Sequence, residues 1–89
     1  MKAVLTVVGR DMVGILADVS AECAAQNVNI EEVSQSVLQD LFCMIMLVDV
    51  SNCPLPLAEF ADLMSEKGQA KGLAIHVMHE DIFRAMHHI

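Results

Sequence analysis

The segment from Thr6 to Ile30 constrains the fold more than any other part of the chain. It reads as the end of a β-strand, a glycine-containing turn, one amphipathic helix and the start of a second strand. Residues 2–8 form a β-rich apolar run, whereas residues 13–26 repeat apolar side chains at the helical period. The segment therefore predicts a β-α-β unit with its turn near residue 10.

The turn from Gly9 to Ile15 is the first candidate site. Asp11 is placed to cap the helix, Gly9 can adopt turn conformations, and Gly14 leaves the first helical turn without a side chain. The unpaired N–H groups and positive dipole end of such a helix can receive a carboxylate or phosphate. The same residue types also make an ordinary connection between strand and helix, so both interpretations stay open.

Four further elements follow the second strand of this unit. The apolar phase changes between Ile30 and Val33, which predicts a bulge near Glu31 and Glu32. Gln39-Asp40 is expected to form a two-residue hairpin connection. The expected elements are strands over 30–38, 41–50 and 73–79, a helix over 56–71, and a short terminal helix over about 81–88 that begins with Asp81 as its cap.

This order predicts one α+β domain over residues 1–89, a ferredoxin-like βαββαβ sandwich. It has a four-stranded antiparallel sheet, two helices on one face and a short C-terminal helix. The strand from Leu41 to Val50 is apolar on both faces, so the face without helices also needs a cover. Either the terminal helix, through Ile82, Phe83, Met86 and Ile89, or a second copy supplies it; we expect a homodimer.

Composition excludes several classes of function. The net charge of −7 opposes nucleic-acid binding, because the five Lys and Arg residues are outnumbered by twelve acidic ones. The longest apolar run, Leu41 to Val48, is far shorter than the ~20 residues of a membrane span. With no signal-peptide pattern and no paired-cysteine motif, we expect a cytoplasmic protein without disulfides or a zinc cluster, in which Cys23 and Cys43 are core residues.

The segment from Val7 to Ile15, followed by Asn27-Val28-Asn29-Ile30, resembles the ACT domain, a small regulatory module that binds amino acids. The ending His79-Glu80-Asp81-Ile82-Phe83 looks more narrowly like that of small stand-alone bacterial ACT-domain proteins. The resemblance implies a homodimer in which the turn and first helix of one copy meet the second strand of the other, with the effector held between them.

The resemblance also implies the residues of the site. Asp11 takes the position of the polar ligand contact, Gly14 that of the close-approach glycine, and Asn29 that of the strand residue offered across the interface. An amino acid carries an ammonium, which Asp11 or the Asn29 carbonyl can accept, and a carboxylate, which the helix N-terminus can receive. The full predicted ligand-binding set is Gly9, Arg10, Asp11, Gly14, Ile15, Asn27 and Asn29, with no cofactor.

Other functions remain as alternatives. Four histidines suggest a metal site, but His76 and His79 lie three apart on a strand and so point to opposite faces, while His87 and His88 diverge on a helix. An enzyme would need a fixed acid/base or nucleophilic arrangement, and the sequence contains none. The main alternative is a ligand-free dimeric adaptor that acts through protein–protein contacts with a regulated partner.

Overall fold

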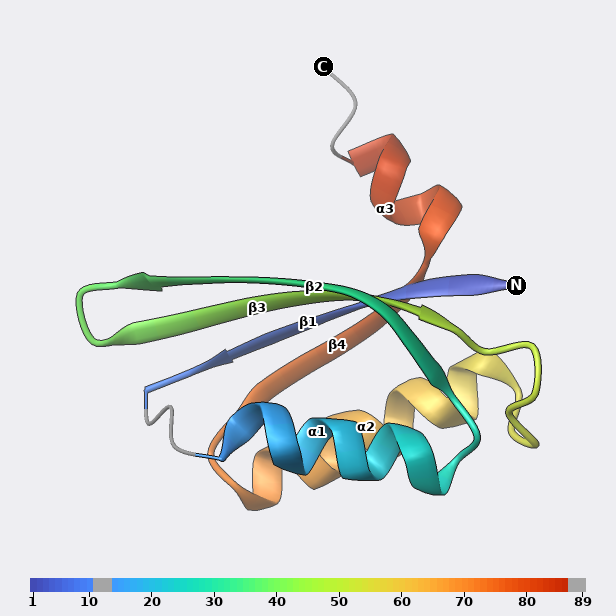
Figure 1. Ribbon diagram of the computed structural model, residues 1–89, viewed down its shortest axis with the longest axis horizontal. Helices are drawn as coiled ribbons and strands as arrows, with labels where there is room; N and C mark the ends of the chain where they lie inside the picture. The colour runs from blue at the N-terminus through green and yellow to red at the C-terminus, as the bar shows by residue number, and fades with distance from the viewer. Residues whose placement is uncertain (11–13, 87–89) are drawn as a thin grey trace.

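The computed structural model describes residues 1–10 and 14–86 of the 89-residue chain. Its elements follow the order β-α-β-β-α-β-α (Figure 1). They are β1 (Lys2–Gly9), α1 (Ile15–Ala25), β2 (Asn29–Leu38), β3 (Leu41–Asp49), α2 (Leu57–Ala70), β4 (Ala74–His79) and α3 (Glu80–Met86).

The four strands form one sheet in the order β2-β3-β1-β4, and every neighbouring pair is antiparallel. β1 and β3 are therefore central, and β2 and β4 are the two edges. Helices α1 and α2 lie side by side against one face of the sheet, and α3 projects from the other (Figure 1). The predicted ferredoxin-like sandwich is confirmed.

The core lies between the sheet and the two long helices. Register places Leu5 opposite Met46 and Val7 opposite Met44, and all four side chains are fully buried. Val19 and Cys23 from α1, with Phe60 and Met64 from α2, close this layer from the helix side. The alternation of the two central strands thus fixes one face as the core, because adjacent side chains on a strand point to opposite faces.

Two local features of β2 match the sequence predictions. The pairing of β2 with β3 shifts register between Ile30 and Glu32, which confirms the bulge. The connection to β3 is the two residues Gln39-Asp40, with Gln39 at φ 58. At the C-terminal end of α1, Asn27 has φ 57 and the Val28 N–H donates to the Cys23 carbonyl at 2.9 Å, so an asparagine in the left-handed region ends the helix.

The predicted core residue Cys43 and the apolar Leu16 both lie outside the core. Leu16 is 40% exposed, because α1 buries Ile15, Val19 and Cys23 in a stripe that leaves the next position outward. Cys43 is half-buried on the opposite face of the sheet, since it pairs with Val8, which points away from the helices.

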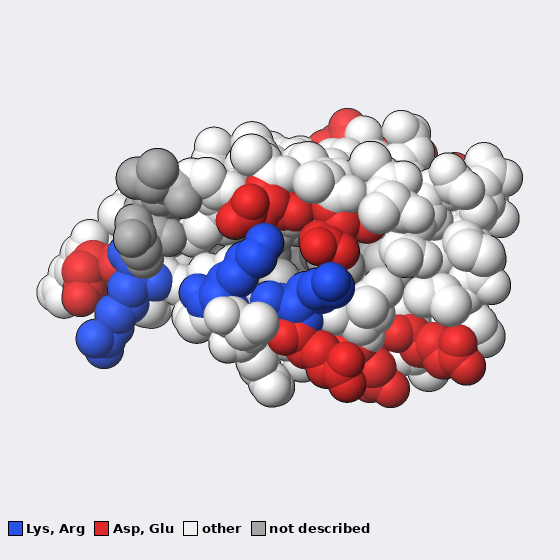
Figure 2. Space-filling model, turned by 90° about the horizontal axis from the view of Figure 1, so that it is seen from below, with Lys and Arg blue, Asp and Glu red and all other residues white. Residues whose placement is uncertain are grey.

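Ion pairs between α1 and α2 lie on the outer surface of the helix layer. Lys71 Nζ is 3.4 Å from Asp18 Oδ2, and Lys67 Nζ is 3.9 Å from Glu22 Oε1. Figure 2 shows this surface, with basic side chains lying among acidic ones. The lysines are about half exposed, so each pair contributes at most about 1 kcal/mol.

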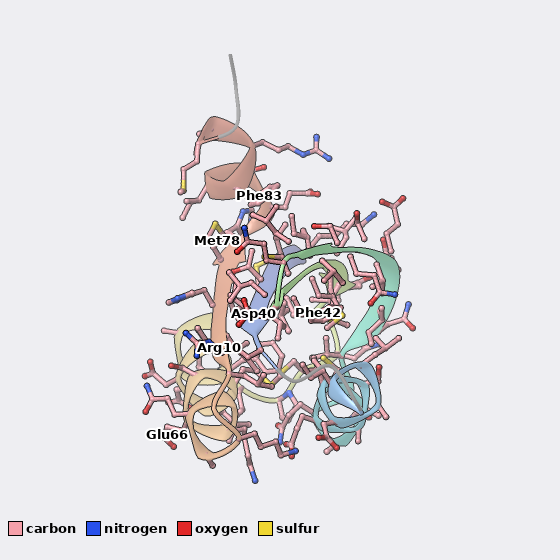
Figure 3. The ribbon with its side chains drawn as sticks, turned by 90° about the vertical axis from the view of Figure 1, so that its left-hand side faces the viewer. Arg10, Asp40, Phe42, Glu66, Met78 and Phe83 are labelled. Atoms are coloured by element: carbon pink, nitrogen blue, oxygen red, sulfur yellow. The ribbon has the colours of Figure 1, made fainter. Side chains whose placement is uncertain are left out.

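Helix α3 covers only part of the open face. It begins at Glu80, and the Asp81 N–H donates to His79 Nδ1 at 3.0 Å; the expected cap at Asp81 is therefore wrong, and the preceding histidine ring accepts at the helix start. Phe83 lies between α3 and the sheet (Figure 3), whereas Ile82 and Met86 are 56% and 67% exposed. Of the expected apolar stripe, Ile89 lies outside the described residues.

Ile45 is 42% exposed on this open face, in a cross-strand row with the polar residues Ser34, Thr6 and His76. Within residues 1–10 and 14–86, no helix is long and apolar enough to cross a membrane.

Candidate functional site

The β1–α1 turn is the first predicted part of the site. Helix α1 begins at Ile15, and its N-cap position is Gly14, at φ 80 in the left-handed region that favours glycine. The helix thus starts later than the sequence predicts, and Asp11 does not occupy the N-cap position. Asp11 itself lies outside the described residues. The first helical hydrogen bond runs from the Asp18 N–H to the Gly14 carbonyl at 2.9 Å, so the N–H groups before it have no helical acceptor.

Gly9 has a different role from the one expected. It is the buried last residue of β1 and does not have a positive φ. A Cβ at Gly9 would instead overlap the side chain of Leu73, which enters β4 from the α2 side. Gly9 therefore permits close packing where β1 leaves the sheet.

Arg10 and Lys71 border a cavity of about 390 Å³ beside this turn. Gly9, Leu41, Gly72 and Leu73 contribute to its wall. Lys71 is paired with Asp18, whereas among the described residues no carboxylate lies within ion-pair distance of Arg10. The cavity therefore has the charge to receive a small anion such as a carboxylate. Ile15, also in the predicted set, is buried in the core and serves packing.

Asn27 and Asn29 form the second predicted part. Both are exposed where α1 passes into β2, and with Val28 and Asn52 they line an open depression of about 480 Å³. Their amide side chains offer donors and acceptors without a fixed charge.

One copy of the chain does not bring the two parts together. Gly9 pairs with Phe42 at the start of β3, and Asn29 pairs with Asp49 at its end. Seven residue steps along an antiparallel strand span roughly 24 Å. The predicted site residues are therefore two clusters at opposite ends of the sheet.

A third cavity, which the sequence analysis did not identify, lies between α3 and the open face of the sheet. It has a volume of about 270 Å³ and combines apolar walls with charged side chains: Val4, Glu32, Val33, Ser34, Ile45, Leu47, Glu80, Phe83 and Arg84. Alternation along β2 and β3 already places Glu32 and Ser34 on one face with Ile45. The direction in which α3 leaves β4 was the missing information, and helical periodicity does not supply it.

Metal and thiol chemistry find little support in the described part of the chain. Within it, no three His, Cys, Asp or Glu side chains gather as a metal site. His76 pairs with Thr6 and His79 with Ala3, so the two histidines lie on opposite faces as predicted; His87 and His88 lie outside the described residues. Burial raises the pKa of the Cys23 thiol to about 11, which keeps it protonated at neutral pH.

Comparison with known proteins decides the family. Residues 2–78 match the family model described as the ACT domain. The chain belongs to the ACT domain family. The match covers every strand except the last residue of β4, and both helices of the main layer, so the family resemblance seen in the sequence is confirmed.

Relatives of this ACT domain extend over its full length. A UPF0237 protein of Methanopyrus kandleri is 43% identical over 88 residues, which are 99% of this chain and 98% of the relative. The solved structure of an ACT domain protein from Streptococcus pneumoniae is 35% identical, with a TM-score of 0.83 and 93% of each chain covered.

A larger protein also contains the same fold. A formyltetrahydrofolate deformylase from Pseudomonas syringae superposes with a TM-score of 0.77 at 23% identity. The superposition covers 88% of this chain but 27% of the deformylase chain. At this identity the likeness concerns the fold alone.

Proposed function

We propose that this ACT domain is a non-catalytic regulatory module that reversibly binds an amino acid, or a similar small zwitterion, between two copies of the chain. The observation that carries the proposal is the placement of the two candidate clusters at opposite ends of one sheet. Gly9, Arg10 and Gly14 lie at the end where β2 finishes, and Asn27 and Asn29 lie at the end where it starts.

A two-fold axis beside β2 would join these clusters. If β2 pairs antiparallel with β2 of a second copy, the Asn29 end of one strand lies beside the Leu38 end of the other. Asn29 of each copy then approaches the β1–α1 turn of its partner. Since a two-fold interface repeats every contact, the dimer would contain two equivalent composite sites.

The β2 edge is suited to such pairing. It is a ten-residue strand bonded on one side only, to β3, and nearly all of it is exposed. An edge strand presents unpaired N–H and C=O groups, which favours addition of another strand. Its apolar side chains Val33 and Val37 are 40% and 63% exposed, and α1 on the same flank exposes Leu16.

The chemistry of the two clusters suits the two charges of an amino acid. Arg10 and the N–H groups of the first turn of α1, which have no acceptor within the helix, would receive the carboxylate. The side-chain amide oxygen of Asn29 would accept a hydrogen bond from the ammonium, beside the main-chain carbonyl of the same residue. Asp11, which the family resemblance assigns to the same ligand, would add a negative charge at the turn.

The proposal also includes a cytoplasmic location and a protein partner. Cys23, Cys43 and Cys53 are free thiols, which suits the reducing cytoplasm. The bound effector would be read out by another protein that recognises the liganded dimer.

Exposed apolar residues on α3 favour a second function, a ligand-free dimeric adaptor. Ile82 and Met86 are exposed on α3, the helix that projects from the open face of the sheet (Figure 1). Exposed apolar side chains of this kind would suit a partner protein. An adaptor and an amino-acid sensor differ in their response to small molecules.

A thermal-shift scan of dialysed protein against the standard amino acids at millimolar concentration tests the proposal. A ligand at 100 times its Kd adds about 2.7 kcal/mol, which moves the Tm of a domain this size by on the order of 10 °C. We expect a shift for one or two amino acids that is lost in Arg10→Ala and Asn29→Ala. The control Gln69→Ala, an exposed change on α2, keeps it.

A flat response to every amino acid would overturn the sensor and favour the adaptor. A shift that survives both Arg10→Ala and Asn29→Ala would place the ligand elsewhere and contradict the composite site.

A further inference from the structure

The cavity under α3 contains a charge that the proposed composite site does not use. Its floor is the open face of the sheet, with Val4 on β1 and Ile45 and Leu47 on β3. Phe83 of α3 forms the opposite wall (Figure 3). Glu32 and Ser34 border it from β2, and register sets them beside Leu47 and Ile45 respectively.

Among the described charged groups around this cavity, the carboxylate of Glu32 has no cationic partner. Lys2 Nζ lies 2.8 Å from Glu31 Oε1, and Arg84 Nη2 lies 3.3 Å from Glu80 Oε2. Arg84, the cation among the described residues that line the cavity, is therefore paired, and so is the nearby Lys2. Among the described residues, no Lys or Arg lies within ion-pair distance of Glu32.

An unpaired carboxylate above an apolar floor selects for a positively charged partner. The floor favours a ligand with an apolar body, because burial of the half-exposed Ile45 releases water from apolar surface. Ser34 lies two residues after Glu32 on the same face of β2, and its hydroxyl can accept a hydrogen bond from an N–H donor. Arg84 and Glu80 neutralise each other, so the carboxylate of Glu32 leaves the site with a net negative charge, which favours a cation over an anion.

We propose that the cavity between α3 and the sheet binds a small primary amine with a compact apolar body, whose ammonium pairs with Glu32 while its body lies on Ile45 and Leu47 beneath Phe83. The volume of about 270 Å³ is at the lower limit of small-molecule pockets, which restricts the ligand to a compact molecule. Unlike the proposed composite site, this one is complete within a single copy.

The probe is phenethylamine, which joins a phenyl ring to an ammonium, titrated into ¹⁵N-labelled protein and followed by amide chemical shifts. The matched probes are 2-phenylethanol, which is neutral, and phenylacetate, which is negatively charged. We expect saturable shifts at Ser34, Ile45 and Phe83 with the amine. Affinities should be at least about tenfold weaker for the alcohol, which cannot form a charge-assisted pair with Glu32, and for the acid, which Glu32 repels.

Two variants test the assignment of residues. Glu32→Gln removes the charge from an exposed position of an edge strand and is expected to weaken phenethylamine binding at least about tenfold. Ile45→Lys places a competing ammonium beside the carboxylate and is expected to abolish binding. The control Glu59→Gln, an exposed change on α2 on the other side of the molecule, leaves binding unchanged.

Equal affinity for the alcohol and the amine would overturn the proposal, as would shifts confined to residues outside this cavity. Unchanged binding in Glu32→Gln would contradict the role of its carboxylate. None of these outcomes depends on Arg10 or Asn29, so the amine site and the composite amino-acid site fail or succeed separately.

Discussion

Gly68 on α2 packs so closely against Ile75 on β4 that a Cβ at Gly68 would lie 2.7 Å from Ile75 Cγ1. The same Cβ would lie 3.0 Å from the backbone oxygen of Leu73, which cannot rotate away as a side chain can. The close contact between α2 and β4 therefore explains why a glycine, Gly68, stands inside this helix.

This contact predicts the effect of Gly68→Ala. Helix propensity alone would favour alanine by about 1 kcal/mol. Overpacking typically costs about 1–3 kcal/mol, and here one of the crowded atoms belongs to the backbone. We expect net destabilisation of about 1–2 kcal/mol in urea unfolding, with the neighbouring exposed change Gln69→Ala as control. A higher unfolding midpoint for Gly68→Ala would show that α2 can move away from β4.

The cost of substituting Gly14 is predicted to come from its backbone conformation and not from crowding. Its φ of 80 is left-handed, and a Cβ there would meet no atom within 4 Å among the described neighbours. Gly14→Ala is expected to cost about 1–2 kcal/mol of unfolding free energy, and Gly14→Asn less, because asparagine visits this conformation more readily. Equal stabilities for the alanine and asparagine variants would argue against a left-handed residue at the start of α1.

Cys23 is predicted to make stability fall at high pH. Burial raises its thiol pKa from 9.0 to about 11, so the folded protein keeps the proton that the unfolded chain releases. The stabilisation is complete below pH 9 and is lost as pH rises through 11. The free energy of unfolding should decline by up to about 1.4 kcal/mol per pH unit in this window.

Comparison with Cys23→Ala isolates this titration. The alanine variant is less stable throughout because it leaves a cavity, but its decline between pH 9 and 11 should be shallower than that of the parent. Identical slopes in the two proteins would show that Cys23 ionises equally in the folded and unfolded states.

Local patterns were enough to predict most of the fold. The change of phase between Ile30 and Val33 predicted the bulge, and Gln39-Asp40 predicted the hairpin connection, because each depends on neighbours in the chain. The outward position of Leu16 and the half-exposure of Cys43 depend on which face of each element meets another layer. That information belongs to the packed molecule rather than to a single segment.

The candidate site is likewise only partly predictable from local sequence patterns. The family resemblance assigned residues to a proposed composite site, but the distance between Gly9 and Asn29 follows from the antiparallel order of β1, β3 and β2. The α3 cavity was missed because it joins Glu32 to Phe83, residues that are far apart in the chain and meet only through the path taken after β4.

The β2 edge is predicted to hold the proposed dimer together. Val37→Lys places a charge at a position 63% exposed in one copy, so the fold of a single copy should be unaffected. Lysine on an edge strand opposes strand addition, both by its charge and by its need for water. Sedimentation velocity at micromolar concentration should show a dimer for the parent protein and a monomer for Val37→Lys.

The matched control for this change is Ile82→Lys, which puts the same charge on an exposed apolar position of α3, away from β2. It should remain dimeric, since the proposed interface does not include α3. If Ile82→Lys is monomeric and Val37→Lys is not, the copies associate through α3 and the open face of the sheet. The Asn29 end of β2 would then not approach the partner's β1–α1 turn, and the composite amino-acid site would have to be abandoned.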